Sequence, residues 1–416
     1  MNQDMKKTAA QAALAARTLA LAAPDKRDGA LAALAANLAG ESRELLKASE
    51  LDQDEAARAG LPSHMLDRLA LTEKRILELI EAVDRVRALA SPLGQVEDKK
   101  TLPDGLEVAR LRIPLGLIAF ICEARPGAPV EAGALALKSG NGLIVKTGRE
   151  MAHAAAALSA VFARSLSSQG LDPRAVTILP FLERESLKEL LSLSETIDLV
   201  IPRGGEGLIR FVSENSRIPV LKHFKGVCHL YVDEGADLEL AIGLTVNGKT
   251  QRPSTCNSLE ALLVHAAEAE AFLPALGRRL AALGVTLKAD PLARKFLPEA
   301  ELAAEGDWGR EFLDLILAVK IVPDYEAALD HIARYGSNHT EVIVTRDAAR
   351  GEHFQRSVEA GCVMINASPR LNDGGCLGLG AEIGISTTRL HAYGPMGLRE
   401  LTTTRFIVTG QGHQRI

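Results

Sequence analysis

The chain has 416 residues, of which 47% are apolar and 24% are charged, and its formal net charge is −5. That length is enough for two or three domains with sizeable cores. Nucleic-acid binding is disfavoured, because it usually needs a basic stripe and stacking aromatics, and only 4% of the residues are aromatic. The five cysteines are scattered and lack C-x-x-C spacing, so we expect a reducing compartment, no disulfide framework and no metal site.

The N-terminal part is predicted to be helical. Its first 23 residues are rich in alanine, and Arg17 interrupts the apolar stretch that a secretory signal would need. No apolar run in the chain reaches transmembrane length, so we expect a cytoplasmic protein without membrane contact. Alanine- and leucine-rich segments continue to about residue 90, with breaks at Pro24, at Gly40, at 60–62 and at 91–92.

A β-hairpin is predicted next. The stretches 96–102 and 106–113 flank a Pro-Asp-Gly turn at 103–105, and Asp-Gly is a strong turn pair. Such a hairpin projects from the body of a protein and often joins the sheet of a partner chain. The tail at 401–408 also predicts a strand, and as an unpaired edge it needs a partner as well.

From residue 115 the chain alternates between strands and helices. The stretch 115–122 is continuously apolar, as in a strand that is buried on both faces. Further strands are predicted at 142–146, 175–179, 198–202, 228–232, 259–264, 316–322, 341–345 and 361–365. Helices are predicted at 130–138, 149–166, 186–192, 208–211, 238–246, 267–283 and 324–335. The rhythm predicts an α/β fold with two doubly wound domains, because parallel strands need helical crossovers.

Cys256 stands out among the cysteines. It lies in KTQRPSTCNS (249–258), between a predicted helix and a predicted strand, and its neighbours are small or polar. Lys249 and Arg252 are close enough in sequence to stabilise a thiolate, the nucleophilic form of cysteine. A cysteine is more often a small buried hydrophobe, so this window alone supports both interpretations.

Two further patterns suggest a cofactor that carries phosphate. RGGEG (203–207) follows a predicted strand and precedes a helix, which is where parallel sheets bind phosphate groups, although ordinary turn glycines would give the same pattern. Lys138 and Lys146 end neighbouring strands and could reach a ribose or a 2′-phosphate, or be ordinary solvated lysines. The many glycines at 374–384 favour close approach of the backbone to a ligand, with a mobile surface loop as the alternative.

Several longer motifs carry a family resemblance. They are IPRGG (201–205), FVSENS (211–216), KTQRPSTCN (249–257), GLGAEIGIST (378–387) and LHAYGPMGL (390–398). On these motifs the chain resembles the γ-glutamyl phosphate reductases, also called glutamate-5-semialdehyde dehydrogenases, a branch of the aldehyde dehydrogenase superfamily. The resemblance runs from about residue 113 to the end of the chain.

The resemblance implies NADPH-dependent reduction of L-glutamyl 5-phosphate to L-glutamate 5-semialdehyde and phosphate, in proline biosynthesis, through a thioester on Cys256. It implies that Asn257 helps to hold the oxyanion, and that NADP(H) is contacted by Lys146, Gly204, Gly205, Gly207 and Glu311. It also implies an aldehyde dehydrogenase-like fold in six parts. These are an N-terminal helical part of the cofactor-binding domain (1–95), an oligomerisation hairpin (96–113), a Rossmann-like cofactor-binding domain (114–227), a catalytic domain (228–368), a return to the cofactor-binding domain (369–400) and an oligomerisation strand (401–416).

The chain departs from its family pattern in one motif, and in a second stretch it lacks the glutamate that hydrolytic aldehyde dehydrogenases use. Cys376 and Leu377 stand where Gln and Phe are more usual, and with Leu371 and Asn372 they bear on the shape of the substrate pocket. Hydrolytic aldehyde dehydrogenases use a glutamate to activate water, but the corresponding stretch, 222–226, has no carboxylate. This favours a thioester that survives for hydride transfer or phosphate attack.

The remaining expectations concern the arginines that bind the substrate, the oligomeric state and the pathway partner. Arg125, Arg203 and Arg252 are candidates for binding the phosphate or the α-carboxylate, since a guanidinium fork matches both. We expect a homo-oligomer, with glutamate 5-kinase as a pathway partner. The alternatives are another superfamily member that acts on a different acyl phosphate or aldehyde, and a non-catalytic oligomeric binding protein of the same fold.

Overall fold

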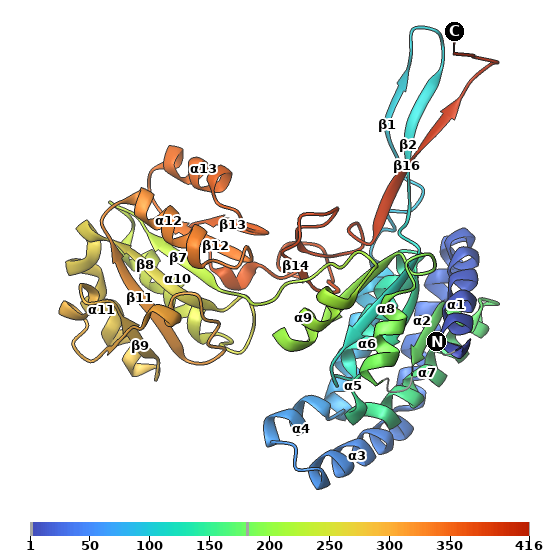
Figure 1. The fold of residues 1–416 in the computed structure, drawn as a ribbon, viewed down its shortest axis with the longest axis horizontal. Helices are drawn as coiled ribbons and strands as arrows, with labels where there is room; N and C mark the ends of the chain where they lie inside the picture. Colours follow the sequence, from blue (N-terminus) through green and yellow to red (C-terminus); the bar gives the residue numbers. More distant parts are fainter. Residues whose placement is uncertain (1–2, 180–182, 416) are drawn as a thin grey trace. The chain divides into compact units, whose positions relative to one another are not determined.

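The computed structural model describes residues 3–179 and 183–415, and the chain forms two compact units (Figure 1). The first unit comprises Met1–Lys222, Leu379–Gly384 and Met396–Ile416, and the second comprises His223–Gly378 and Ile385–Pro395. Of the stretch 369–400, which was expected to return to the cofactor-binding domain, only 379–384 and 396–400 belong to the first unit. The other residues of that stretch belong to the second unit.

Helices begin the first unit, as the sequence predicts. They are α1 (Gln3–Leu21), α2 (Pro24–Gly40), α3 (Ser42–Arg58), α4 (Ser63–Leu69) and α5 (Glu73–Ala88). Pro24 occupies the first turn of α2, where its missing N–H costs nothing, and the Thr72 side chain accepts a hydrogen bond from the Arg75 backbone at the start of α5. Among the described residues, no helix is both long and apolar enough to cross a membrane.

A four-stranded parallel sheet follows in the same unit. Its strands are β3 (Leu117–Cys122), β4 (Gly142–Lys146), β5 (Val176–Leu179) and β6 (Leu199–Arg203), and its helices are α6 (Gly127–Lys138), α7 (Ala152–Ser167), α8 (Arg184–Leu191) and α9 (Glu206–Asn215). Every residue of β3 is buried, which confirms the strand expected to be covered on both faces. In the order β5-β4-β3-β6, the chain adds β4 and β5 on one side of β3 and then crosses over to add β6 on the other side. Ligands of open α/β sheets bind at such a switch point, here between β3 and β6.

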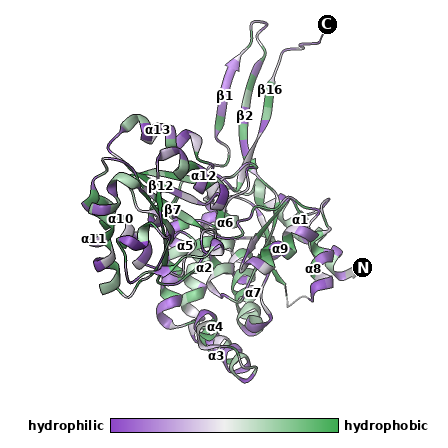
Figure 2. Cartoon of the chain, turned by 60° about the vertical axis from the view of Figure 1, so that its left-hand side comes forward, coloured by the Kyte–Doolittle hydropathy of each residue, from purple (hydrophilic) through white to green (hydrophobic). Residues whose placement is uncertain are grey.

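A three-stranded antiparallel arm completes the first unit. It contains β1 (Val96–Thr101), β2 (Glu107–Pro114) and β16 (Thr402–Thr409), and Figure 2 shows hydrophilic and hydrophobic residues mixed along it. The tail strand was expected to be an unpaired edge, which is wrong. It pairs with β2 of its own chain from Thr402 opposite Pro114 to Thr409 opposite Glu107. The outer edges of the arm are therefore β1 and β16.

The second unit is built on a seven-stranded parallel sheet in the order β10-β9-β11-β8-β7-β12-β13. Its strands are β7 (Cys228–Val232), β8 (Leu259–His265), β9 (Thr286–Ala289), β10 (Glu301–Leu302), β11 (Ile316–Val322), β12 (Thr340–Val344) and β13 (Cys362–Ile365). Its helices are α10 (Leu238–Thr250), α11 (Ala269–Ala282), α12 (Tyr325–Tyr335) and α13 (Ala348–Ser357), and a short pair, β14 (Ile385–Ser386) and β15 (Gly394–Pro395), lies outside the sheet. Side chains of the central strands and of α11 form its core, which includes Leu262, Phe272 and Leu276. Two doubly wound units plus the arm confirm the predicted fold class.

Candidate active site

Cys256 lies on the loop that joins α10 to β8 in the second unit. Pro253 follows the last turn of α10, and a proline there prevents the helix from continuing. The Ser258 backbone N–H donates to the Thr255 carbonyl at 3.0 Å, so the chain turns sharply around the cysteine. Its thiol is consequently partly exposed, whereas those of Cys122 and Cys228 are buried.

Gly226 passes directly beside the Cys256 backbone. A Cβ built on Gly226 would lie 1.9 Å from the Cys256 carbonyl oxygen, so no other residue fits without moving the loop. The Cys228 thiol donates to the same oxygen at 3.3 Å. The structure thus places the stretch expected to lack a water-activating base directly against the candidate nucleophile.

Two histidines lie beside Cys256 that the sequence analysis did not select. One ring nitrogen of His223, one of His339 and the Cys256 sulfur all lie within 4.8 Å of one another. His339 Nδ1 is 2.7 Å from the Thr340 hydroxyl, and burial together with the nearby His223 lowers the pKa of His339 to about 3. His339 is therefore neutral near pH 7. No local signal reveals this cluster, because its members lie on three separate loops.

The Asn257 side chain supports the loop. It is buried, and its amide donates to the backbone carbonyls of Asn372 at 3.0 Å and of Arg370 at 3.4 Å. Its Oδ1 accepts from the Thr255 hydroxyl at 3.0 Å. The amide donors thus hold the 370–372 segment, and the oxyanion role of Asn257 stays a prediction.

Lys249 was expected to stabilise a thiolate on Cys256, and its surroundings show a different role. It is fully buried, and its ammonium group donates to the Glu260 carboxylate at 2.8 Å and to the Leu259 carbonyl at 2.9 Å. Burial raises the pKa of Glu260 and the neighbouring Lys249 opposes that rise. The other Glu260 oxygen accepts from the Leu313 backbone at 3.3 Å, so this ion pair holds the segment that carries Glu311. Lys249 is thus a structural residue and not the expected partner of a thiolate.

Arg370 and Arg252 supply positive charge near the cysteine loop. Arg370 donates to the Thr255 hydroxyl and to the Gln251 side chain, both at 2.8 Å. Its pKa is lowered by burial and by the charge of nearby Arg252, which is exposed. Arg370 was not selected from the sequence, although the 370–377 motif contained it.

The other two candidate arginines, Arg125 and Arg203, belong to the first unit. Glu131 there has its pKa raised by burial, and both arginines oppose that rise. These two guanidinium groups therefore lie near the end of β3, at the same edge as the switch point.

Glu311, the expected ribose contact, lies in the second unit beside the cysteine loop. Its carboxylate accepts a hydrogen bond from the Gly226 backbone N–H at 2.9 Å. Gly226 also lies against the Cys256 backbone, so a single residue, Gly226, links Glu311 to the cysteine loop.

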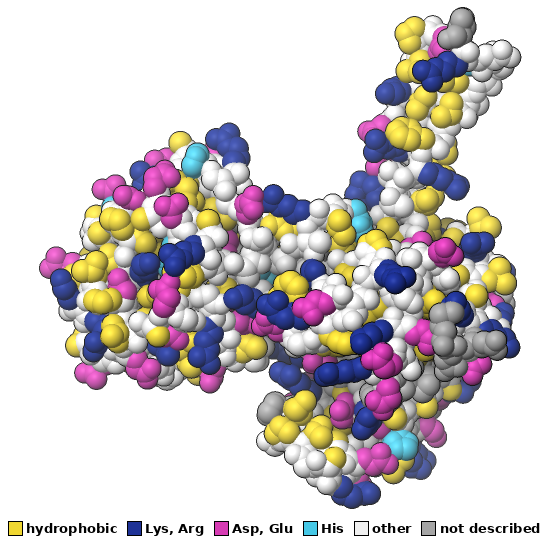
Figure 3. Space-filling view, in the orientation of Figure 1, with side chains coloured by type: hydrophobic (Ala, Val, Ile, Leu, Met, Phe, Trp, Pro, Cys, Tyr) yellow, Lys and Arg dark blue, Asp and Glu magenta, His cyan; other side chains and the backbone are white. Residues whose placement is uncertain are grey.

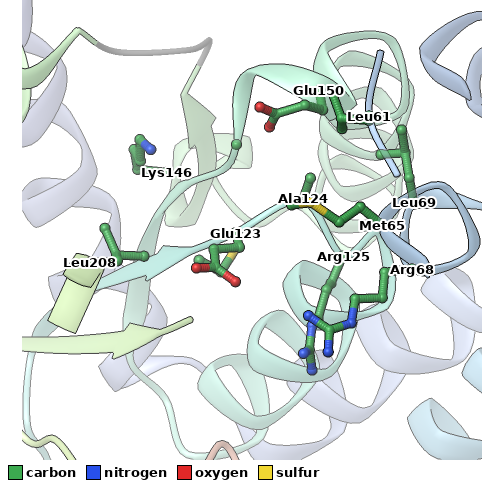
Figure 4. A pocket seen from close by; sticks show the side chains of 12 residues that line it. Leu61, Met65, Arg68, Leu69, Glu123, Ala124, Arg125, Lys146, Glu150 and Leu208 are labelled. Atoms are coloured by element: carbon green, nitrogen blue, oxygen red, sulfur yellow. The ribbon is translucent and has the colours of Figure 1, made fainter. Parts of the chain in front are cut away.

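A pocket of about 280 Å³ lies at the switch-point edge of the first unit (Figure 4). Its lining comes from the ends of β3 and β4, from the start of α9 and from the α3–α4 region, and it includes Lys146, Glu123 and Leu208. Lys146 is mostly buried, and burial lowers its pKa. The pocket thus offers Lys146 together with two arginines, Arg68 and Arg125, and the carboxylates of Glu123 and Glu150.

The glycine loop 203–207 lies beside this pocket. Glu123 accepts a hydrogen bond from the Gly205 backbone at 2.7 Å, and a Cβ on Gly204 would lie 2.7 Å from that carboxylate. A Cβ on Gly207 would meet nothing within 4 Å, so packing within the protein does not require glycine there. Gly205 directly precedes α9, and no side chain caps the helix there, while the N–H of Gly205 itself is engaged by Glu123.

Comparison with known proteins decides the family. The model of the aldehyde dehydrogenase family matches residues 1–295. The gamma-glutamyl phosphate reductase of Xanthomonas campestris pv. campestris (strain 8004) is 49% identical over 411 residues, 99% of each chain. The one of Thermus thermophilus is 51% identical over 401 residues, 96% of this chain and 97% of that one. The chain belongs to the γ-glutamyl phosphate reductase branch of the aldehyde dehydrogenase family.

Solved structures agree with this membership. The crystal structure of the Thermotoga maritima gamma-glutamyl phosphate reductase has a TM-score of 0.97 and 40% identity, and the match covers 99% of this chain and all of that one. An acetylating aldehyde dehydrogenase from Geobacillus thermoglucosidasius, at 16% identity and a TM-score of 0.70, shares the fold. As in the rest of the aldehyde dehydrogenase family, the cofactor expected here is a nicotinamide nucleotide.

Proposed function

We propose that this protein reduces L-glutamyl 5-phosphate to L-glutamate 5-semialdehyde, with release of phosphate, in the cytoplasmic synthesis of proline. The observation that carries the proposal is a cysteine on a tight turn, with two imidazoles beside its sulfur, in a chain of this family. The pathway then requires an enzyme that phosphorylates the side-chain carboxylate of glutamate, as glutamate 5-kinase does.

Cys256 acts as the nucleophile. Its thiolate attacks the acyl carbon of the substrate, the C–O bond to phosphate breaks, and a thioester remains on the sulfur. We assign the thiol proton to His223, because its Nδ1–H donates to the Ile385 carbonyl at 3.0 Å, which leaves the lone pair on Nε2. His339, with a pKa of about 3, is too weak a base to hold that proton near pH 7.

The residues of the first unit fit a nicotinamide dinucleotide with a 2′-phosphate. Lys146 offers a cation in the switch-point pocket, and Gly204, Gly205 and Gly207 open α9 next to it. Glu311 in the second unit has a carboxylate for a ribose hydroxyl. When bound, NADPH would supply the hydride that reduces the thioester to the aldehyde level.

The anionic groups of the substrate need cations. Arg252 and Arg370 lie beside the cysteine loop, and a guanidinium fork matches a phosphate or a carboxylate. Arg125 and Arg203 supply further cations at the edge of the first unit. We assign the oxyanion to backbone N–H groups of the cysteine turn other than that of Ser258, which donates to Thr255, because the Asn257 side-chain amide is engaged.

The reverse reaction tests the proposal. Glutamate 5-semialdehyde and NADP⁺ are expected to give NADPH only when inorganic phosphate is present, because 223–226 offers a histidine where a hydrolytic enzyme has a glutamate. Arsenate is expected to replace phosphate. The measurement is the rate of NADPH formation with and without phosphate. Equal rates with free glutamate as product would instead identify a hydrolytic aldehyde dehydrogenase, and no turnover with any aldehyde would favour a binding protein.

A further inference from the structure

The two imidazoles beside Cys256, those of His223 and His339, are also suitable metal ligands. His339 is fully buried, and its Nε2 is a buried polar atom for which the described residues provide no hydrogen-bond partner. An orphaned nitrogen of this kind is costly unless something binds it. Nδ1 of the same ring is 2.7 Å from the Thr340 hydroxyl and 3.7 Å from the Cys228 sulfur, so its orientation is held from behind.

We propose that Cys256, His223 and His339 form a zinc-binding site, and that Zn²⁺ bound there reversibly blocks the thiol. The three ligand atoms already lie within 4.8 Å of one another. In a tetrahedral zinc site with bonds of about 2.0–2.3 Å, ligand atoms stand about 3.3–3.6 Å apart. The site therefore has to close by about 1 Å, which side-chain rotation of the two partly exposed residues, Cys256 and His223, can supply.

The donor set selects zinc over the common hard cations. A thiolate with two imidazoles suits Zn²⁺, whereas Mg²⁺ and Ca²⁺ prefer oxygen ligands. Both rings are held by their Nδ1 atoms, to the Ile385 carbonyl for His223 and to the Thr340 hydroxyl for His339, and such contacts orient metal-binding histidines. The fourth position is left for water or for an anion of the substrate or product.

Zinc binding removes the nucleophile without changing any covalent bond of the protein. The Cys256 thiol loses its proton to solvent as the Zn–S bond forms, and the bound sulfur then no longer attacks an acyl carbon. A chelator reverses the process by removing the metal. Inhibition rests on the proposed function, but metal binding at these three side chains does not.

Equilibrium titration of the full-length protein with Zn²⁺ against a chromophoric chelator tests the site directly. We expect one Zn²⁺ per chain, loss of this site in Cys256→Ser, and affinity at least about tenfold lower in His223→Ala and His339→Gln. His223 is partly exposed, so its replacement is tolerated by the fold, and glutamine retains much of the volume of the buried His339. Circular dichroism of each variant shows whether it is folded.

Two variants serve as matched controls. Cys376→Ser removes an exposed cysteine and His353→Ala an exposed histidine, and neither residue belongs to the cluster. Both are expected to bind Zn²⁺ as the parent does. If the controls weaken binding as much as the cluster variants do, or if folded His223→Ala and His339→Gln bind with parental affinity, the site is wrong.

A readout without any substrate separates this proposal from the enzymatic one. Stoichiometric Zn²⁺ should protect Cys256 from alkylation by iodoacetamide, measured by mass spectrometry of its peptide, and a chelator should restore the reaction. Co²⁺ in place of Zn²⁺ should give a thiolate charge-transfer band that Cys256→Ser lacks. Alkylation at the same rate with and without bound metal would show that the sulfur is not a ligand, whatever reaction the protein catalyses.

Discussion

At the scale of single residues, burial separates the reactive side chains from the structural ones. Burial raises the pKa of Cys122 to about 12 and that of Cys362 to about 11, so both remain thiols near pH 7. Cys256 differs in lying, partly exposed, on a turn beside Arg252, Arg370 and two imidazoles. Lys249 is likewise a structural residue, because it is fully buried and its ammonium group pairs with Glu260.

Replacement of Cys256 by alanine is expected to lower kcat by at least about 10³-fold, because a covalent nucleophile is lost. The midpoint of thermal unfolding should hardly change, since a loop thiol contributes little packing. Steady-state kinetics and thermal unfolding are the two measurements.

Cys362→Ala is the matched control. It removes a partly buried strand thiol and should retain activity while it lowers stability by about 1 kcal/mol. Comparable activity of parent and Cys256→Ala would rule out the thioester mechanism.

Lys146 is expected to select NADPH over NADH. Lys146→Ala removes the buried cation at the end of β4 and should raise the KM for NADPH by at least about tenfold more than the KM for NADH, since only NADPH carries the 2′-phosphate. Steady-state kinetics with each cofactor measure the ratio.

The neighbouring Lys138 offers a control of the same type. Its ammonium group donates to Asp28 at 2.6 Å and to the Arg87 carbonyl at 2.7 Å, so Lys138→Ala should lower stability and leave the cofactor ratio unchanged. An equal effect of Lys146→Ala on both cofactors would remove Lys146 from the proposed role.

At the scale of elements, loops and turns position the site more than helices and strands do. The segment before β7, the α10–β8 loop and the loop before β12 each bring one member of the Cys256 cluster. Parallel strands begin at the same edge of a sheet, and β8, β7 and β12 are neighbours, which is why these segments far apart in sequence meet there.

Gly226→Ala is expected to lower kcat by at least about tenfold, because its Cβ would overlap the Cys256 carbonyl and displacements of about 1 Å at a reacting group can cost 10²-fold. Circular dichroism should show that the variant remains folded. Gly243→Ala is the control, since its Cβ meets nothing and alanine in a helix stabilises by about 0.5–1 kcal/mol. Similar activities of the two variants would contradict this account of the loop.

Local patterns do not predict every element equally well. The residues of β9 and β10 were not predicted as strands, and these strands have only four and two residues. Helix α13 was missed because only Gly351 and Phe354 of it are buried, which leaves little apolar periodicity to detect. Strand β3 was predicted because all six of its residues are buried and apolar.

At the scale of the whole molecule, the arm of β1, β2 and β16 exposes apolar side chains. Phe406 is 66% exposed and Val408 57%, and Figure 3 shows apolar groups along the arm among charged ones. Three strands with two open edges and exposed apolar residues are an incomplete sheet. We propose that the arm joins a second copy of this chain.

The protein is therefore expected to be at least a dimer, and deletion of 401–416 should yield monomers or aggregates with weakened activity. Val408→Lys is a milder change that keeps β16 and should also weaken association. Thr403→Lys is the control, since it alters the same strand near its start on the body, and it should leave association unchanged. Multi-angle light scattering at micromolar concentration measures the mass. A monomeric parent protein would contradict the role of the arm.

The order of strands and helices could be read from the sequence by itself. Apolar runs and alternating periodicity reflect burial, and burial in a doubly wound sheet is nearly continuous along each strand, as in β3 and β8. The motif around Cys256 likewise pointed to the family, which the comparisons confirm, and to Cys256 as the candidate nucleophile.

Only the tertiary structure decided what surrounds that nucleophile. It showed that Lys249 pairs with Glu260, that Asn257 holds the 370–372 segment, and that the tail strand pairs with its own hairpin. It also brought His223 and His339 to Cys256. Each of these contacts joins residues whose separation along the chain or whose burial depends on how the sheet is assembled, and no periodicity or spacing in the sequence encodes such a contact.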